Sequence, residues 1–546
     1  MALAAGIAVA CAVHIVPVAS AAQAVPAARA AGRALSLPAM RQRVPVAHAA
    51  PVVPIAVDVG SVARGRPLAP GFLGLALEYR SIPSLAGARS ASAVDPVLVA
   101  LVHALDPAGG TVLRIGGQSA DRSWWPVPGM PRPPGITYDL TPAWVASAAA
   151  LAQALNAKLI LGLGLEADRP RIDAVEAGHL LAGLGGMTEA LTIGNEPMLY
   201  SQIPWYRILH GKAIPWYSQG GTAVYGRAPT YGPAAYEREW SRVAAALPKG
   251  VPLAGPDDGT PSLLQGFERR LGPRSRLRLI AVHDYPLSRC DGNPASSGYP
   301  SVPNLLTPAA ASGAVRGLGP GIALAHRYGA KFLIDEMGSI SCNGRAGVSD
   351  TLASALWLLD ALFRVDAAGI DGVQLHNFSG LVNDLFDFTH AGGDWLASVH
   401  PLYYGALMFT QAAPAGSRLL RATSADPVTL RSWATTAPDG RVRVLLINDS
   451  LSSTALALVR VAGRAGGASS SAAAALERLR AASAYSTGGV SLGGRSFGSL
   501  TATGSLPAPV PESAEPRAGA YRIRLAPGSA ALLTLPPVRT APATAR

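Results

Sequence analysis

The feature that most constrains the fold is an eightfold alternation of short apolar runs with helix-like segments between residues 54 and 403. Such alternation is typical of a parallel sheet whose strands are connected by helices. Because polar and aromatic residues gather directly after the strands, we expect a closed (β/α)8 TIM barrel, with an open doubly wound sheet as the alternative. The predicted strands are 72–79, 111–115, 158–163, 190–193, 251–255, 279–282, 331–334 and 372–375.

Beyond residue 404 the pattern changes to β-prone runs with no helices between them. The segments 442–448 and 521–525 are of this kind, and the turn at 526–529 predicts a terminal hairpin with 531–535. We therefore expect an additional C-terminal antiparallel β-sandwich, joined by a strand near 54–59. The expected boundaries are 51–68 for the joining strand, 69–403 for the barrel, 404–537 for the sandwich and 538–546 for a disordered tail.

The N-terminal segment is typical of an exported protein. Residues 1–24 are apolar from Leu3 to Val18 and end in small residues that suit a cleavage site near Ala22 or Ala24, although a basic start is missing. A membrane anchor is the alternative, but the run is short and contains His14 and Pro17. Residues 25–50 are a low-complexity Ala/Pro-rich linker. We expect a secreted protein, extracellular or periplasmic, with no membrane span after signal removal.

Cysteine usage agrees with export. Cys11 would leave with the signal, so Cys290 and Cys342 would remain in the mature chain. Both follow predicted strands whose loops are neighbours at one end of the barrel, so we expect one disulfide between them, with two free thiols as the alternative.

The net charge of +12 has a limited meaning, because six of the Arg residues lie in the expected linker and tail: Arg29, Arg33, Arg41, Arg43, Arg539 and Arg546. A basic surface attracts acidic polysaccharides. No Lys/Arg run is interleaved with aromatic residues, so nucleic acid is not an expected partner. The oligomeric state is not predictable from this pattern.

Two carboxylates end predicted strands. Glu196 closes Leu191-Thr192-Ile193-Gly194-Asn195-Glu196-Pro197, and Glu336 closes Phe332-Leu333-Ile334-Asp335-Glu336. In a barrel both acids project from the carboxyl-terminal rim, where barrel enzymes have their active sites. Two facing carboxylates are the minimum apparatus for glycoside hydrolysis, and the amide of Asn195 suits a sugar 2-hydroxyl.

These motifs resemble the retaining glycoside hydrolases of the four-seven barrel clan, in which the acid follows strand four and the nucleophile strand seven. Within it the chain is most similar to glycoside hydrolase family 79, the β-glucuronidase and heparanase-like group. The matching stretches are Phe72 to Glu78, Leu113-Arg114-Ile115-Gly116-Gly117-Gln118-Ser119-Ala120-Asp121 and Ile193 to Tyr200.

The resemblance implies a secreted retaining hydrolase of β-glycosidic bonds, with Glu196 as acid/base and Glu336 as nucleophile. It also implies that Arg114 keeps Glu336 charged, that Tyr285 donates to it and that Asn195 holds the 2-hydroxyl. The family commonly has Asn at Gln118, and the segment from His376 and Asn377 to Leu381 differs from the Tyr-Gly pattern that holds a uronate. The expected substrate is a glucuronide or an acidic oligosaccharide or polysaccharide.

Further residues are candidates for substrate contacts, because aromatic faces pack against sugar rings and imidazoles can line the pocket. These are Trp124, Tyr200, His283 and His376. We expect no metal and no cofactor, since no two-His ligand spacing, phosphate loop or dinucleotide motif occurs. The alternatives are a retaining enzyme of the same clan for a neutral glucoside or arabinofuranoside, and a carbohydrate-binding protein without turnover.

Overall fold

The structure is a computed structural model that describes residues 52–537 except 88–89, 392–393, 464–472 and 511. The expected signal segment, the whole of the expected linker and the tail lie outside the described residues. Among the described helices, none combines the length and apolar character needed to cross a bilayer.

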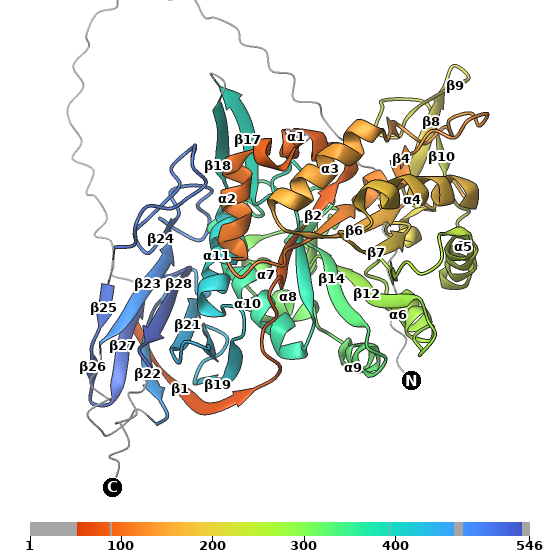
Figure 1. Cartoon of the computed structure of the whole chain (residues 1–546). Coiled ribbons are helices and arrows are strands. Elements are labelled where there is room, and N and C mark those ends of the chain that lie inside the picture. Colours follow the sequence, from red (N-terminus) through yellow and green to blue (C-terminus); the bar gives the residue numbers. More distant parts are fainter. Residues whose placement is uncertain (1–51, 88–89, 392–393, 464–472, 511, 538–546) are drawn as a thin grey trace, which may run out of the picture.

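A closed parallel barrel of eight strands forms the larger part of the described chain (Figure 1). All eight predicted strands are present in the expected order, so the barrel prediction is confirmed. They are β2 (Leu73–Glu78), β3 (Val112–Gly116), β6 (Lys158–Leu163), β7 (Thr188–Ile193), β11 (Leu253–Pro256), β12 (Leu277–Asp284), β14 (Lys331–Met337) and β16 (Gly372–His376). Pairing of Leu253 with Leu191 closes the ring between β11 and β7.

Helices connect the strands on the outside of the barrel. They include α2 (Pro96–Leu105), α3 (Pro142–Ala154), α4 (Pro170–Leu184), α5 (Pro233–Ala246), α6 (Pro261–Glu268), α9 (Gly319–Arg327), α10 (Leu352–Ala368) and α11 (Pro401–Ala412). Thr141 caps α3 by accepting from Trp144 N, and Pro142 occupies the first helical position, where its missing N–H costs nothing.

The predicted barrel boundary at 403/404 is wrong, because it falls inside α11. Nearly every residue of α11 is buried, and the helix packs along α10. The apolar segment 402–409 therefore continues the helical layer of the barrel, and the β domain begins at Arg418.

The β domain is one sheet of eleven strands that encloses its own core. Its strands are β1 (Val52–Arg64), β19 (Arg418–Ser424), β20 (Leu430–Thr436), β21 (Val442–Asn448), β22 (Thr454–Val461), β23 (Ala474–Arg480), β24 (Ser491–Leu492), β25 (Glu512–Ala514), β26 (Pro516–Arg517), β27 (Ala520–Leu525) and β28 (Ser529–Leu535). Buried residues from both halves, such as Val459, Ile523, Val444 and Leu533, form one apolar cluster.

The N-terminal strand β1 joins the two halves of this sheet, as expected for the strand before the barrel. It is parallel to β22 and antiparallel to β19. Figure 1 shows it as a long red strand running along the blue sheet. The expected terminal hairpin is wrong: β27 pairs with β22, whereas β28 pairs with β21 and β23. The turn between them carries the chain from one half of the sheet to the other.

The β domain packs against the helical layer of the barrel. The Trp433 ring stacks on Phe363 of α10 with centroids 5.4 Å apart, and its Nε1 donates to Asp360 Oδ1 at 2.8 Å. Arg431 donates to Asp449 at 2.6 Å and to the carbonyl of Leu306 at 2.7 Å. The interface thus combines apolar burial with buried hydrogen bonds and ion pairs.

Candidate active site

The polar residues at the carboxyl end of the barrel continue the inward-facing positions of the strands. Val112, Ala281 and Leu333 belong to a buried cluster inside the barrel. Because side chains alternate along a strand, the residues two positions further on also point inward. They are Arg114, His283 and Asp335, which are at most 7% exposed.

Arg114 connects the carboxyl groups of the site. Its Nη1 donates to Glu336 Oε2 at 2.6 Å, and its Nη2 donates to Asn195 Oδ1 at 2.6 Å and to Asp257 Oδ2 at 2.8 Å. Burial alone would lower the pKa of Arg114, but the carboxylates of Asp257 and Glu336 raise it well above its ordinary value. The guanidinium therefore stays charged inside the barrel.

A bulge in β14 brings two consecutive residues to this guanidinium. The pairing with β12 shifts between Ile334 and Glu336. Bulges re-aim side chains and occur next to active sites. Here Asp335 Oδ2 lies 3.8 Å from Arg114 Nε while Glu336 binds Nη1. Without the shift, alternation would point one of the two carboxyls away.

Glu336 is held in its ionised form. Tyr285 donates its hydroxyl to Glu336 Oε1 at 2.8 Å. Burial alone would raise the pKa of Glu336, but the positive charges of His376, His283 and Arg114, together with the Tyr285 hydrogen bond, lower it to about 2.

Glu196 reaches the site from a turn after β7. Gly194 has φ 79° and Glu196 has φ 44°, a left-handed conformation that is uncommon for a residue with a side chain. The Glu196 N–H donates to the carbonyl of Asp257 at 2.9 Å, which fixes the turn. Local backbone strain of this kind is found where a surrounding site requires one orientation.

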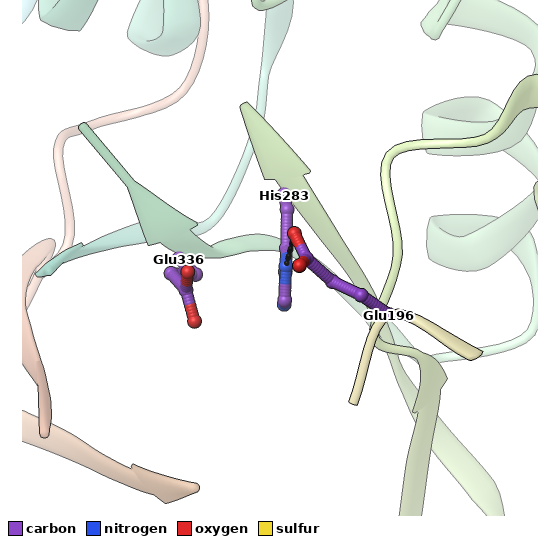
Figure 2. A group of neighbouring side chains, drawn as sticks. All are labelled: Glu196, His283 and Glu336. Atoms are coloured by element: carbon purple, nitrogen blue, oxygen red, sulfur yellow. Dashed lines mark hydrogen bonds and ion pairs between the residues drawn. The ribbon is translucent and has the colours of Figure 1, made fainter. Parts of the chain in front are cut away.

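His283 lies between the two glutamates (Figure 2). Its Nδ1 is 3.1 Å from Glu196 Oε1. Burial would lower the pKa of His283, but the Glu336 charge and the hydrogen bonds of Asp257 and Glu196 raise it well above its ordinary value. One oxygen each of Glu196 and Glu336 lie within 4.8 Å of each other. The side chain of Glu196 is 30% exposed and that of Glu336 only 8%.

Asp121 and Tyr200 position the segment that carries Glu196. Asp121 Oδ2 accepts from Asn195 N at 3.2 Å and from the Tyr200 hydroxyl at 2.8 Å, and its Oδ1 accepts from Leu165 N at 2.7 Å. The carboxylate thus ties together the loops after three successive barrel strands. Tyr200, predicted as a substrate contact, is 4% exposed and serves this network through its hydroxyl.

His376 lies on the Glu336 side of the site. Its Nδ1 is 3.2 Å from the Tyr285 hydroxyl, and its Nε2 is 3.7 Å from Glu78 Oε1. Burial would lower the pKa of His376, but the charges of Glu336 and Glu78 raise it. Glu78 also accepts from Ser119 N at 2.8 Å, which ties β2 to the loop after β3.

Two predicted substrate contacts are not available to a substrate. Trp124 is 3% exposed, donates to Asp139 at 2.7 Å and packs with Val127 and Ile172. Asn377 is 1% exposed, and its Oδ1 accepts from Leu385 N at 2.9 Å. Both predictions are corrected because the two side chains are buried, and the neighbouring chain uses Trp124 Nε1 and Asn377 Oδ1.

The remaining predicted residue, Gln118, is half-buried and lines a hollow next to Glu196.

Sequence reasoning missed Glu78, Asp121, Asp257 and Asp335 as members of the site. Each is an acid at the end of a barrel strand or in the loop after it, which is the signal that singled out the two glutamates.

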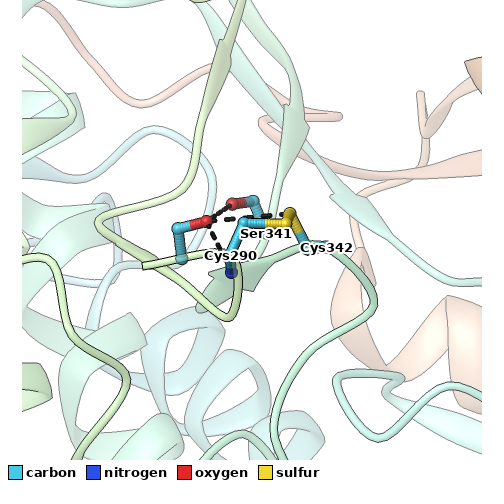
Figure 3. The surroundings of a disulfide bond; sticks show 4 residues. Cys290, Ser341 and Cys342 are labelled. Atoms are coloured by element: carbon cyan, nitrogen blue, oxygen red, sulfur yellow. Dashed lines mark hydrogen bonds between the residues drawn. A yellow bond between two sulfur atoms is a disulfide. The ribbon is translucent and has the colours of Figure 1, made fainter. Parts of the chain in front are cut away.

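The loops after β12 and β14 are covalently joined. Cys290 and Cys342 form a disulfide with a Cα–Cα distance of 6.1 Å, within the usual range of about 4.4–6.8 Å (Figure 3). Nearby, Ser341 donates its hydroxyl to Ser288 at 2.9 Å, and β13 (Leu287–Ser288) pairs with β15 (Ile340–Ser341). The predicted disulfide is confirmed, and it ties together the loops that follow Tyr285 and Glu336.

Within the described part of the chain, two groups of side chains have metal-ligand chemistry: Glu196, His283 and Glu336, and Asp257, His283 and Asp335. His283 belongs to both, and its raised pKa favours the protonated ring, whereas a metal binds the neutral one. Arg114 already binds carboxylates of both groups. These residues therefore suit an internally neutralised acid–base site better than a cation.

No protein-family model and no curated protein sequence matches this chain. Solved structures match over most of its length. A 4-O-α-L-rhamnosyl-β-D-glucuronidase from Fusarium oxysporum 12S has 19% identity and a TM-score of 0.63, over 88% of this chain and all of that chain. A glycoside hydrolase family 51 arabinofuranosidase from Xanthomonas axonopodis pv. citri has 14% identity and a TM-score of 0.58, over the same shares.

A family 44 xyloglucanase from Paenibacillus polymyxa has 11% identity and a TM-score of 0.55, over 89% of this chain and all of that chain. At these identities the likeness establishes the fold. The chain therefore has the (β/α)8 barrel with an added β domain that these glycoside hydrolases share.

Proposed function

We propose that the protein is a retaining glycoside hydrolase of the four-seven barrel clan. The observation that carries the proposal is the pair Glu196 and Glu336, which follow barrel strands four and seven and have oxygens within 4.8 Å of each other. Carboxyl groups about 5–5.5 Å apart suit a double displacement, whereas inverting enzymes need about 6.5–9.5 Å to admit a water molecule.

In this mechanism the ionised Glu336 attacks the anomeric carbon and forms a glycosyl ester. Glu196 donates a proton to the glycosidic oxygen, so the leaving group departs as a neutral alcohol. Glu196, now a carboxylate, then removes a proton from water, and the resulting nucleophile cleaves the ester. Both carboxyls return to their starting protonation states.

The surrounding residues support these roles. Arg114 and Tyr285 bind the two oxygens of Glu336, which stabilises its negative charge and fixes its orientation. Asn195 Oδ1 accepts a hydrogen bond from Arg114, so the Asn195 amide nitrogen is the group left to donate to a sugar 2-hydroxyl.

For the substrate we propose a β-linked glucuronide, with membership of family 79. The motif resemblance supports this, as does the rhamnosyl-glucuronidase among the structural neighbours. A uronate carboxylate in a mostly dry pocket needs a charged partner. His376 is the best candidate, because neighbouring carboxylates raise its pKa and its buried Nε2 has no hydrogen-bond partner among the described residues.

A neutral sugar is the second candidate, and a specific observation favours it. In the segment after strand eight, the Ser379 hydroxyl and the Gly380 N–H both donate to Asp387 Oδ1 at 2.9 Å, so neither is left to bind a uronate. The Glu78 carboxylate, 3.7 Å from His376, would also repel a substrate carboxylate.

Export is part of the proposal, since disulfides such as Cys290–Cys342 persist in oxidising compartments. The function is tested with 4-nitrophenyl β-glucuronide, β-glucoside and α-arabinofuranoside, and by NMR of the first-formed product anomer. Retention together with a preference for the glucuronide is expected. Inversion contradicts the mechanism. If the glucoside is cleaved at least as well as the glucuronide, a neutral sugar takes the place of the glucuronide as the proposed substrate. A protein that neither cleaves these substrates nor is labelled by mechanism-based cyclic inhibitors is a binding protein.

A further inference from the structure

A polar hollow adjoins Glu196 on the side away from the contacts of Glu336. Its lining comes from the loops after the second, third and fourth barrel strands, whereas Tyr285 and His376, the neighbours of Glu336, follow the sixth and eighth. The lining residues are Gln118, Asp121, Arg122, Glu166, Asn195, Glu196, Leu199, Tyr200 and Ile203.

A buried ion pair forms one wall of the hollow. Arg122 Nη1 donates to Glu166 Oε2 at 2.5 Å, and the two side chains are 5% and 2% exposed. Glu166 is held in place by close packing, because a Cβ on Gly226 would lie 2.3 Å from its Cγ. The carbonyl of Glu166 also accepts from Arg227 at 2.8 Å.

Each residue of this ion pair has one polar atom that makes no hydrogen bond to the described residues. Glu166 Oε1 and Arg122 Nε are both buried and have no hydrogen-bond partner among the described residues. Buried polar groups are normally paired, because an unsatisfied one has lost its hydration without replacement. The Asp121 carboxylate, by contrast, is fully used by its backbone and Tyr200 partners. The unpartnered carboxyl oxygen of this wall is therefore Glu166 Oε1, which lies close to Gly226.

The size of the hollow limits its occupant. It has room for little more than one water-sized group, so a whole sugar ring does not fit inside. A hydroxyl or hydroxymethyl group does fit, with the ring that carries it lying above the hollow against the half-buried side chains of Leu199 and Ile203.

We propose that this hollow binds a hydroxyl or hydroxymethyl group of the leaving sugar, with Glu166 and Gln118 as its hydrogen-bonding residues. The inference rests on the proposed function: Glu196 protonates the glycosidic oxygen, so the leaving group must lie on the Glu196 side. The substrate class is then a glycoside whose leaving group is itself a sugar, rather than an aryl or alkyl alcohol.

The test compares two substrates with the same glycone. These are 4-nitrophenyl β-glucuronide and β-glucuronosyl-(1→4)-glucose or, for a neutral-sugar enzyme, 4-nitrophenyl β-glucoside and cellobiose. Glu166→Gln keeps the shape but weakens the acceptor, and Gln118→Ala removes the second residue with little risk to folding. Each is expected to lower the ratio of kcat/KM on the disaccharide to kcat/KM on the aryl glycoside about tenfold, mainly through KM.

Glu176→Gln is the matched control. Glu176 on α4 is also a buried carboxyl with an unpartnered oxygen, but it does not line the hollow. Its substitution should leave the ratio unchanged. Equal losses on both substrates in the Glu166 and Gln118 variants overturn the proposal. No loss on either substrate also overturns it and leaves a water molecule as the occupant.

A second measurement separates this inference from the function itself. Saturation-transfer NMR with free glucose reads binding without turnover, and the signal should weaken in Glu166→Gln and persist in Glu176→Gln. A wild type that cleaves neither substrate refutes the proposed function. A glucose signal that Glu166→Gln leaves unchanged refutes the hydroxyl-binding hollow.

Discussion

Arg114 donates to Glu336 across 2.6 Å inside the barrel, and neither side chain is more than 8% exposed. A buried ion pair of this kind contributes little by itself, because desolvation of the two charges offsets their attraction. Removal of one partner is costly, since the other charge is then left buried. Arg114 also binds Asp257, so its loss would leave two carboxylates without their cation.

We therefore expect Arg114→Met to lower the free energy of unfolding by about 3–5 kcal/mol and to abolish activity. Glu336→Gln is the comparison, because Arg114 keeps Asp257 and the new amide oxygen can still accept from it. Urea denaturation of the two variants measures the difference. If the two variants are equally destabilised, Arg114 is not needed to compensate the buried charge of Asp257.

The two glutamates should respond differently to the leaving group. Glu336→Gln is expected to abolish turnover of every substrate, since it removes the nucleophile. Glu196→Ala should spare substrates with very good leaving groups, which need no protonation, and azide should restore its activity by replacing the missing base. Steady-state kinetics on a series of aryl glycosides checks this, and equal losses across the series contradict the assignment of roles.

Tyr285→Phe should alter the pH dependence. The Tyr285 hydrogen bond stabilises the charged form of Glu336, whose pKa is about 2. Its loss raises that pKa, so the acid limb of kcat/KM should move to higher pH. Profiles of both proteins over the range in which they remain folded measure the shift, and coincident acid limbs would rule out this contribution.

The barrel strands were predictable because each is a short β-prone run that ends in polar residues. Arg114, Glu196 and Glu336 were predictable for the same reason. The bulge at Asp335 and Glu336 was not, since it depends on pairing with β12 and not on local sequence. Its consequence is that Asp335, next to a recognised acid, also belongs to the site.

The incorrect predictions concern partners that are distant in the sequence. Nothing local to Trp124 shows that it packs under its own loop, and nothing local to Asn377 shows that Leu385 N donates to its Oδ1. The terminal hairpin failed likewise: the turn at 526–529 is real, but which strands pair on either side is decided across the whole sheet.

The contribution of Glu176 to the stability of the protein should fall as the pH rises from acidic to mildly alkaline values. Burial raises the pKa of Glu176 to about 8, and a backbone hydrogen bond from Trp125 opposes part of this rise. Between its ordinary value near 4.5 and about 8, the folded state then binds more protons than the unfolded state. The free energy of unfolding falls by up to about 1.4 kcal/mol per pH unit for such a group.

Glu176→Gln removes this titration, so we expect a flatter pH profile and a more stable protein at pH 8 than the wild type. Thermal unfolding at several pH values between 4 and 9 measures it. If the two proteins lose stability in parallel over this range, Glu176 is not the group responsible.

The disulfide between Cys290 and Cys342 should stabilise the protein and its active site together. It joins residues 52 apart in sequence, so reduction releases chain entropy in the unfolded state, worth about 2–4 kcal/mol. It also links the loops that follow Tyr285 and Glu336 on neighbouring strands.

We expect the double variant Cys290→Ser/Cys342→Ser to unfold at a lower temperature and to lose kcat, because the hydrogen bond between Tyr285 and Glu336 is less well held. Dithiothreitol should reproduce the loss in the wild type and have no effect on the double variant. Recovery of both cysteines as free thiols by peptide mapping without reductant would show that the bond does not form in solution.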